Sequence, residues 1–449
     1  MARLFGTDGV RGLANVDLTA PLALELGEAA ARLTIQGRPA SGHKPKAIIG
    51  RDTRISGEFL DHALAAGLAS AGMDVVRVGV VTTPTVAHLT ASSSVDLGVM
   101  ISASHNPMPD NGIKFFAHGG YKLPDQVEDQ IQELLNTSWD RPTGAAVGEV
   151  EYDDDWAEKS YIEHLMTSLG TDLHGLRIAV DCANGGASFL APEAFRQAGA
   201  DAVVINAAPD GRNINDKAGS THPEQLQALT VASEADFGVA YDGDADRCLA
   251  VDRDGNIVDG DKIMGALAVH MRDEGQLAKD TLVVTVMSNL GLILAMQEAG
   301  IKTVQTGVGD RYVLEAMLEG GYSLGGEQSG HIIAKKYATT GDGILSSLLL
   351  ARMVKESGRD LADLTSFIKR LPQTLINVEG VDRSRANTDP AVQEAVAAAE
   401  AVLGNTGRVL LRPSGTEPLV RVMVEAATQS QADGVASRLA DVVKENLAL

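Results

Sequence analysis

Three times along the chain, an apolar run leads directly into a polar loop, and this repeated design constrains the fold more than any other feature. The loops carry Ser104, Asp242 and Glu327. Each apolar run is predicted to be a buried strand, and strand and helix signals alternate around it. Because 449 residues are too many for one hydrophobic core, we expect several α/β domains of one design. In such folds ligands bind beyond the strand ends, so these loops are the first candidates for a site.

We predict an α/β protein with four domains. Three similar mixed α/β domains, in which strands alternating with helices run parallel, precede a C-terminal α+β domain. The last domain differs because strand signals at Leu375–Val378, Val409–Leu411 and Val420–Val424 combine with amphipathic helices near 391–403 and 431–445. The expected domain ranges are 1–150, 151–255, 256–372 and 373–449.

The strand predicted at Leu97–Ile101 stops at a loop that contains Ser104. Pro107 shapes this loop, because it cannot donate to a strand ladder and disfavours helical angles at Asn106. The chain then returns and brings the amine of Lys114 back toward the loop. Ser104 is either a nucleophile or phosphoryl carrier, or part of an ordinary turn rich in Ser, Asn and Pro. This stretch alone does not decide between the two.

Three carboxylates, those of Asp242, Asp244 and Asp246, follow the strand before the second loop. Held close together they repel one another, and a hard divalent cation that prefers oxygen ligands relieves this repulsion. A calcium loop of the EF-hand type requires Gly and Glu where this chain has Arg247 and Arg253, so we favour Mg²⁺. The alternative is a solvated acidic turn. Mg²⁺ beside a serine that carries phosphate would form a phosphoryl-transfer centre.

A group of residues in the last domain suits an anion. Arg412, Ser414, Gly415 and Thr416 surround a turn, and Arg421 follows nearby. Backbone N–H groups, hydroxyls and a guanidinium are the donors that bind a phosphate. An ordinary Pro-Ser-Gly turn is the alternative. We favour the phosphate site because Arg412 and Thr416 flank the turn.

Glu327, Ser329 and His331 alternate along the third loop. Such spacing can direct all three side chains at one ligand, and a carboxylate with a hydroxyl suits the hydroxyl groups of a sugar. His331 is either an acid or base that works near neutral pH, or a structural residue. Near the N-terminus, closely spaced glycines allow the backbone to approach a ligand, and Arg11 could then reach an anion.

The formal net charge of −22 argues against a nucleic-acid partner and against an anionic membrane surface. It allows an anionic small ligand in a local basic pocket. Cys182 and Cys248 each lie in or beside an apolar run, so we expect buried thiols rather than a disulfide or a metal pair. The sequence has no signal-peptide pattern and no apolar run near the ~18 residues that span a membrane, which favours a cytoplasmic location.

Four motifs in this order, one in each predicted domain, resemble those of the α-D-phosphohexomutase superfamily over essentially the whole chain. The motifs are Ser104-His105-Asn106-Pro107, Asp242-Gly243-Asp244-Ala245-Asp246-Arg247, Gly326-Glu327-Gln328-Ser329-Gly330-His331 and Arg412-Pro413-Ser414-Gly415-Thr416-Glu417-Pro418. The opening Gly6–Gly12, Gln328 and Gly415 resemble the branch of bacterial phosphoglucosamine mutases. Phosphomannomutase/phosphoglucomutase relatives usually have Met and Asn at the last two positions.

This resemblance implies a heart-shaped enzyme of four domains with its active site in a central cleft. It implies that Ser104 is a phosphoserine, and that one Mg²⁺ per subunit binds its phosphate together with Asp242, Asp244 and Asp246. Other motif residues would bind substrate or assist the transfer. The implied roles are phosphate contact for Arg247, sugar contact for Glu327 and Ser329, phosphate binding for Arg412, Ser414, Gly415, Thr416 and Arg421, and proton transfer or charge stabilisation for Arg11, Lys114 and His331.

The implied reaction interconverts glucosamine 6-phosphate and glucosamine 1-phosphate through a glucosamine 1,6-bisphosphate intermediate. It would feed UDP-N-acetylglucosamine and cell-wall synthesis, with glucosamine or glucose 1,6-bisphosphate as the activator. The expected partner is therefore a small phosphosugar, and a homodimer is left open. Two alternatives are phosphomannomutase/phosphoglucomutase chemistry on a neutral sugar, and a sugar-phosphate sensor without catalysis.

Overall fold

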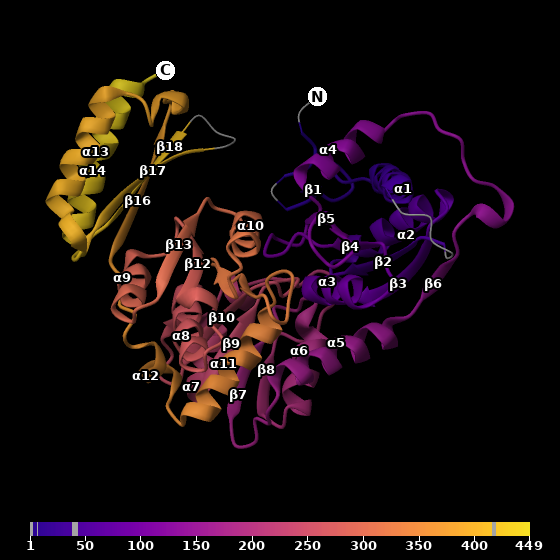
Figure 1. Ribbon diagram of the computed structural model, residues 1–449, viewed down its shortest axis with the longest axis horizontal. Helices are drawn as coiled ribbons and strands as arrows, with labels where there is room; N and C mark the ends of the chain where they lie inside the picture. The colour runs from indigo at the N-terminus through magenta and orange to yellow at the C-terminus, as the bar shows by residue number, and fades with distance from the viewer. Residues whose placement is uncertain (1–2, 7, 38–43, 415–418) are drawn as a thin grey trace. The chain divides into compact units, whose positions relative to one another are not determined.

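The computed structural model describes residues 3–6, 8–37, 44–414 and 419–449. The chain divides into two compact units, one made of Met1–Met287 with Ile301–Ser366 and the other of Ser288–Gly300 with Phe367–Leu449. The described strands form four sheets of six, five, four and three strands (Figure 1). The first three sheets belong to the first unit and the fourth to the second. The predicted domain boundaries near 150, 255 and 372 remain predictions.

The first sheet carries the Ser104 loop. Its strands, in spatial order, are β1 (Val10–Leu13), β5 (Asp110–Ala117), β4 (Leu97–Ile101), β2 (Lys46–Arg51), β3 (Asp74–Val80) and β6 (Val150–Tyr152). The helices in this part are α1 (Ala20–Gly37), α2 (Ile55–Ser70), α3 (Thr83–Ser92) and α4 (Asp125–Leu134), with a 3₁₀ turn η1 (Gly144–Ala146). Apolar side chains from α1 and α2 form one buried cluster with those of the sheet, including Leu26, Leu60 and Ile101. This cluster fixes the strand end from which the Ser104 loop begins.

The second sheet carries the loop with the three carboxylates. Its order is β11 (Ile257–Val258), β10 (Cys248–Asp252), β9 (Phe237–Tyr241), β7 (Arg177–Asp181) and β8 (Asp201–Ile205). Its helices are α5 (Asp154–Leu169), α6 (Ala187–Gln197) and α7 (Glu224–Ala232), with η2 (Gly219–Thr221). Cys182 and Cys248 are free, buried thiols, as the sequence predicted.

The third sheet carries the Glu327 loop. Its order is β13 (Lys302–Thr306), β12 (Thr281–Thr285), β14 (Leu324–Gly326) and β15 (Ile332–Ala334). The helices of this part of the first unit are α8 (Gly260–Asp273), α10 (Asp310–Gly320), α11 (Gly343–Ser357) and α12 (Leu361–Thr365), with η3 (Ala278–Asp280).

The three sheets share one strand order around their polar loops. In each sheet, the strand that precedes the polar loop lies between two neighbours. One neighbour is the strand that follows the loop, and the other is the first of the parallel strands. The resulting orders are β5-β4-β2-β3, β10-β9-β7-β8 and β15-β14-β12-β13. The strands that alternate with helices run parallel, as predicted. The strand after each loop runs antiparallel, because its connection is too short for a crossover helix. The expected mixed α/β design is therefore confirmed.

The second unit contains a small antiparallel sheet covered by helices. The sheet has the order β16 (Gln373–Glu379), β18 (Leu419–Glu425) and β17 (Arg408–Pro413). The unit also contains α9 (Leu290–Glu298), α13 (Pro390–Leu403), α14 (Gln429–Leu447), η4 (Arg383–Arg385) and η5 (Gly404–Thr406). Figure 1 shows α13 and α14 side by side along this sheet, where their apolar faces bury Val392 and Val443 against Val422. This unit has the α+β form expected from its sequence.

None of the helices within the described ranges is both long and apolar enough to cross a membrane.

A buried carboxyl group ties two helices of the first unit together. Asp342 caps the N-terminus of α11, where its Oδ1 accepts a hydrogen bond from Leu345 N at 2.9 Å. The Tyr161 hydroxyl, on α5, donates to the same carboxyl group at 2.8 and 2.9 Å. Burial raises the pKa of Asp342 to about 6, because it outweighs the hydrogen bonds that favour the ionised form. Ionising this group at neutral pH therefore lowers the stability of the folded state.

We predict that Asp342→Asn becomes more stable relative to the wild type as pH rises. The raised pKa stabilises the folded wild type fully only below the unfolded value of 3.8, and this contribution is lost as pH rises through about 6. Asparagine can keep the cap and has no charge to lose. Between pH 5 and pH 8 the difference in unfolding free energy should shift toward the variant by roughly 1–2 kcal/mol, as measured by urea titration. A difference that stays constant with pH would contradict this account.

Candidate active site

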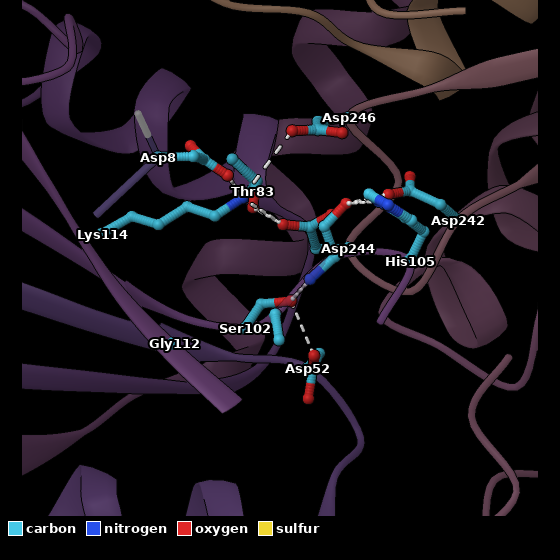
Figure 2. Close-up of polar contacts among 12 residues, drawn as sticks. Asp8, Asp52, Thr83, Ser102, His105, Gly112, Lys114, Asp242, Asp244 and Asp246 are labelled. Carbon is cyan, nitrogen blue, oxygen red and sulfur yellow. Dashed lines mark hydrogen bonds and ion pairs between the residues drawn. The ribbon is translucent and has the colours of Figure 1, made fainter. Parts of the chain in front are cut away.

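Ser104 lies in an unusual backbone conformation that its neighbours impose. Its φ is +54°, in the left-handed region, and its side chain is 1% exposed. The Ser102 hydroxyl accepts a hydrogen bond from Ser104 N at 2.9 Å and donates to Asp52 Oδ2 at 2.6 Å. Figure 2 shows Ser102 between the loop and Asp52. Strain of this kind persists only where the surroundings over-determine it, and it clusters at functional sites.

The carbonyl group of Ser104 is fixed from two sheets. Arg54 Nη2 donates to it at 3.1 Å, and Asn215 Nδ2, from the second sheet's connections, donates at 2.9 Å. Both also donate to Asn106 O. Gly243 packs directly against the Ser104 carbonyl oxygen, since a Cβ at this position would lie 2.5 Å from it. The absence of a side chain at Gly243 therefore lets the carboxylate loop approach the serine loop.

The three predicted carboxylates converge beside the Ser104 hydroxyl. Ser104 Oγ donates to Asp242 Oδ2 at 2.5 Å. One oxygen from each of Asp242, Asp244 and Asp246 lies within 4.8 Å of the others, and all three residues are buried. Asp244 is held from behind, because Thr83 Oγ1 donates to its Oδ2 at 2.6 Å and Thr83 N donates to its backbone oxygen at 2.9 Å (Figure 2). The N-terminus of α3 thereby fixes the loop.

This carboxylate set fits a divalent cation. Burial, together with Asp246 and Asp244, raises the pKa of Asp242 well above its usual range, because three buried carboxylates resist ionising together. Asp244 Oδ1 and Asp246 Oδ1 are buried and have no hydrogen-bond partner among the described residues. Buried, unpartnered carboxylate oxygens at this spacing are the ligands that a hard cation requires. The sequence prediction that these residues can hold a metal is thus supported by their geometry.

Lys114, on β5, lies on the far side of the carboxylates. Its Nζ is 2.7 Å from Asp244 Oδ2, 3.7 Å from Asp246 Oδ2 and 2.9 Å from Asp8 Oδ2. Figure 2 shows its side chain reaching between Asp8 and Asp244. Burial lowers the pKa of Lys114, but Asp244 and Asp8 outweigh burial and raise it overall, so the amine is charged. Its direct partners are these carboxylates, whereas the sequence placed it toward Ser104.

Arg11 and His105 flank the same loop. Arg11, on β1, donates from Nη1 to Ala103 O at 3.3 Å and pairs with Asp8 through Nη2. His105 Nδ1 lies 3.2 Å from Ser104 Oγ. Burial, followed by Arg247 and Arg11, lowers the pKa of His105 to about 4, so its imidazole is neutral at pH 7.

The Glu327 loop reaches the carboxylates through His331. His331 Nδ1 lies 3.6 Å from Asp246 Oδ2, and its Nε2 accepts a hydrogen bond from Gly341 N at 3.0 Å. Burial lowers the pKa of His331, but Asp246 and Asp310 together raise it above its ordinary value. The loop is closed by Glu327 N, which donates to His331 O at 2.9 Å. His331 is therefore part of the same cluster as the carboxylates.

The other predicted residues of the first unit lie on this loop and beside it. Glu327 is half-buried and its Oε1 accepts from Gly309 N at 3.1 Å, while Ser329 is exposed. Arg247 N donates to Asp242 Oδ1 at 3.2 Å, and its Nε lies 3.8 Å from Asp246 Oδ1. The structure thus brings together, in the first unit, the Ser104 loop, the carboxylate loop and the Glu327 loop.

The predicted phosphate loop lies in the second unit. Arg412 on β17 and Arg421 on β18 are directly opposite each other in the antiparallel register. Like charges in this position destabilise a sheet, so a bound anion would relieve the repulsion. Ser414 N donates to Leu419 O at 2.9 Å, and Arg383 Nη1 donates to Ser414 O at 2.5 Å. Gly415 and Thr416 lie outside the described residues.

Several residues that shape the site were given no role from the sequence. Asp52 and Arg54 follow the strand β2, so the pattern of an apolar strand running into a polar loop could have found them. Thr83, Asn215, Lys122 and Asp310 reach the site only through tertiary packing and leave no local signal. Asp8 lies within the glycine-rich N-terminal segment that was noted only for Arg11.

Four protein-family models match the chain in sequence order. Their descriptions are phosphoglucomutase/phosphomannomutase alpha/beta/alpha domain I over residues 2–141, domain II over 159–255, domain III over 259–371 and C-terminal domain over 375–442. The chain is 61% identical over 454 residues to a phosphoglucosamine mutase of Bifidobacterium animalis subsp. lactis. It is 59% identical over 452 residues to one of Streptomyces coelicolor. Both comparisons cover 100% of each chain.

Solved structures have the same fold. A phosphoglucomutase/phosphomannomutase family protein of Burkholderia thailandensis is similar with a TM-score of 0.82 at 26% identity, covering 99% of this chain and 97% of that one. An N-acetylphosphoglucosamine mutase of Aspergillus fumigatus, solved in complex with GlcNAc-6P and magnesium, has a TM-score of 0.70 at 20% identity. That comparison covers 99% of this chain and 96% of the fungal one, and it supports the fold alone.

We predict that Mg²⁺ raises the thermal unfolding temperature of the first unit, because a cation relieves the repulsion among the three buried carboxylates. Asp244→Asn and Asp246→Asn should each weaken or abolish this shift. The matched control is Asp261→Asn, which alters a buried carboxyl group on α8, outside the carboxylate loop. Differential scanning calorimetry with and without MgCl₂ measures the effect. An equal Mg²⁺ shift in the wild type and in both loop variants would refute binding at these carboxylates.

Proposed function

The chain is an enzyme of the phosphoglucomutase/phosphomannomutase family and belongs to its phosphoglucosamine mutase branch, and we propose that it interconverts glucosamine 6-phosphate and glucosamine 1-phosphate. The observation that carries this proposal is the direct hydrogen bond from Ser104 Oγ to Asp242, inside a set of three buried carboxylates. A hydroxyl in this position can carry a phosphoryl group beside a cation site.

In the proposed reaction the phosphoryl group of a phosphorylated Ser104 passes to O1 of glucosamine 6-phosphate. The bond between phosphorus and Ser104 Oγ breaks, the bond between phosphorus and O1 forms, the O1 proton leaves to a base, and Ser104 Oγ takes up a proton. The product of this step is glucosamine 1,6-bisphosphate. The 6-phosphoryl group then returns to Ser104: the bond between phosphorus and O6 breaks, the bond between phosphorus and Oγ forms, Oγ loses its proton, O6 takes up a proton, and glucosamine 1-phosphate is released. Glucosamine or glucose 1,6-bisphosphate can therefore phosphorylate an empty Ser104.

The residues of the first unit suit this transfer. We propose that Asp242, Asp244 and Asp246, with the Ser104 phosphate, hold one Mg²⁺. When bound, this ion neutralises phosphoryl oxygens as charge moves during transfer. Lys114 keeps the carboxylates oriented and supplies positive charge from the opposite side. Arg247 lies beside Asp242 and Asp246, where it can contact a phosphate.

The acid or base of the reaction lies among Arg11, Lys114 and His331. We favour His331, because its imidazole is the only one of the three basic groups that titrates near neutral pH in its ordinary state. Arg11 and Lys114 are then sources of positive charge. Glu327 and Ser329 would bind sugar hydroxyls, since they lie on the loop that His331 ends.

The phosphate that does not react would bind in the second unit. We propose that Arg412, Ser414, Gly415, Thr416 and Arg421 hold it. The support from the described residues is the opposition of Arg412 and Arg421 across two strands, which a dianionic phosphate would stabilise.

Two other functions are weighed against this one. Phosphomannomutase/phosphoglucomutase activity uses the same chemistry on a neutral sugar and differs only in what the Glu327 loop accepts. A sensor that binds sugar phosphates without catalysis would not need a buried serine hydroxyl against three carboxylates. We further propose a small phosphosugar as the partner, with no nucleic-acid or membrane partner. We also propose a cytoplasmic location, because both cysteines are free thiols. A homodimer stays a prediction.

We predict that Ser104→Ala abolishes turnover, because Ser104 carries the one hydroxyl that donates to Asp242 among the described residues. Intact-mass measurement should show one added phosphate on the wild-type protein and none on this variant. Binding of glucosamine 6-phosphate, followed by calorimetry, should remain measurable.

Ser102→Ala is the matched control for this experiment. Ser102 is buried two residues away, but its hydroxyl is bonded to Asp52 and Ser104 N. This variant should still carry one phosphate and should turn over slowly, because the loop loses a support rather than the carrier. Phosphate retained on Ser104→Ala, or full activity in that variant, would exclude the phosphoserine mechanism.

We predict that kcat/KM is highest for glucosamine phosphate among the glucosamine, glucose and mannose 1-phosphates. The measurement is a coupled assay with each sugar at several concentrations. A preference for mannose phosphate would assign the chain the neutral-sugar activity instead. Binding of all three sugars without turnover would assign it the sensor function.

A further inference from the structure

Six buried or half-buried side chains form a closed ring behind the carboxylate loop, in which acids and bases alternate. We name this set the charge ring. Its members, in order around the ring, are Asp8, Lys114, Asp246, His331, Asp310 and Lys122. Three of them, Asp8, Lys122 and Asp310, have no place in the proposed reaction.

The ring is continuous at the level of single atoms. Asp8 divides its two oxygens, since Oδ2 lies 2.9 Å from Lys114 Nζ and Oδ1 lies 2.5 Å from Lys122 Nζ. Lys122 Nζ also pairs with Asp310 Oδ2, and the same oxygen lies 3.6 Å from His331 Nε2. Lys122 therefore links Asp8, which pairs with Lys114, to Asp310, which faces His331.

The members come from separate parts of the fold. Asp8 precedes β1, Lys114 is on β5, and Lys122 follows β5 in the first sheet's region. Asp246 belongs to the loop after β9, Asp310 is the first residue of α10, and His331 lies just before β15. The ring thus joins elements of all three sheets of the first unit around the two groups that flank the carboxylates.

Stability alone is a poor explanation for this arrangement. None of the six side chains is more than 19% exposed. Removing ions from water costs free energy that their mutual attraction often does not recover, and apolar replacements of such groups are often neutral or stabilising. The six paired groups are therefore better explained as a device that fixes the orientation of side chains at the site than as a source of stability for the fold.

We propose that Lys122 and Asp310 are positioning residues that hold Lys114 and His331 against the carboxylate loop from opposite sides. Lys122 pairs with Asp8 Oδ1, while Asp8 Oδ2 faces both Lys114 and Arg11. Asp310 Oδ2 lies 3.6 Å from His331 Nε2, on the imidazole edge opposite the one that faces Asp246, and Gly341 N donates to the same nitrogen. The pair formed by Lys122 and Asp310 thus contributes to the orientation of both basic groups without touching the carboxylate loop. This inference rests on the proposed function, because its readout is the phosphoryl transfer.

A neighbouring ion pair provides a matched control. Arg311 Nη1 pairs with Asp125 Oδ1, and Arg311 Nη2 donates to Leu123 O at 2.8 Å. These contacts join the same two segments as the Lys122–Asp310 pair, namely α10 and the segment after β5. Arg311 is the residue after Asp310, and Asp125 lies three residues after Lys122. They make no contact with Lys114, His331 or Asp246 among the interactions of the described residues. Breaking this pair therefore tests simple cross-linking without altering the ring.

The experiment compares Lys122→Met and Asp310→Asn with Arg311→Met and Asp125→Asn. We expect each ring variant to lower kcat by about 10- to 100-fold, the scale seen when an outer partner of a metal site is lost, with little change in KM. The control variants should keep kcat close to the wild-type value. Lys122→Arg should recover most of the lost kcat, because it keeps the charge between Asp8 and Asp310. Thermal unfolding shows whether each variant folds. If Lys122→Met does not fold, the kcat values of Asp310→Asn and Lys122→Arg test the inference.

The outcomes separate this inference from the proposed function. Equal losses in ring and control variants would overturn the inference and reduce the ring to a cross-link. A rise in KM with kcat unchanged would also overturn it, because the residues would then act on substrate binding. A wild-type chain that does not interconvert the glucosamine phosphates would remove the proposed function and the inference together.

Discussion

The rest of the site depends on the repulsion among three buried carboxylates. Asp242, Asp244 and Asp246 cannot all be ionised in this environment without compensating positive charge, and the surrounding protein supplies only part of it, mainly through Lys114. A cation completes the balance, and the hydroxyl of Ser104 lies where an attached phosphate would share that cation. The fold therefore keeps the two loops together at an energetic cost that ligands remove.

The parts of the site that are local in sequence were predictable. Asp242, Asp244 and Asp246 lie within five residues, so their convergence needs only one loop. Ser104 was identified because an apolar strand ends abruptly before it. The repetition of this design predicted three related domains, and the structure shows why it recurs: each loop joins a strand to an antiparallel neighbour in the same strand order. Strand and helix signals were equally readable wherever apolar residues were periodic.

The parts created by tertiary packing were not predictable. Lys122 and Asp310 are 188 residues apart in sequence, and each has an unremarkable local pattern. Lys114 was expected to return toward Ser104 with β5, which pairs antiparallel to β4, but its direct partners Asp244 and Asp8 come from other segments and could not be predicted. Contacts of this kind depend on which segments pack against each other in the folded chain, and the local sequence of one segment does not reveal its distant partner.

The left-handed backbone of Ser104 also selects its chemistry. A threonine would offer the same kind of hydroxyl, but a β-branched side chain at a φ near +54° is strongly disfavoured. Arg54, Asn215 and Gly243 hold the backbone in this conformation from outside, so the loop cannot relax to accept one. The identity of the phosphate acceptor is thereby decided by peptide geometry before any difference in nucleophilicity matters, and a phosphorylated threonine is excluded from this position by the main chain.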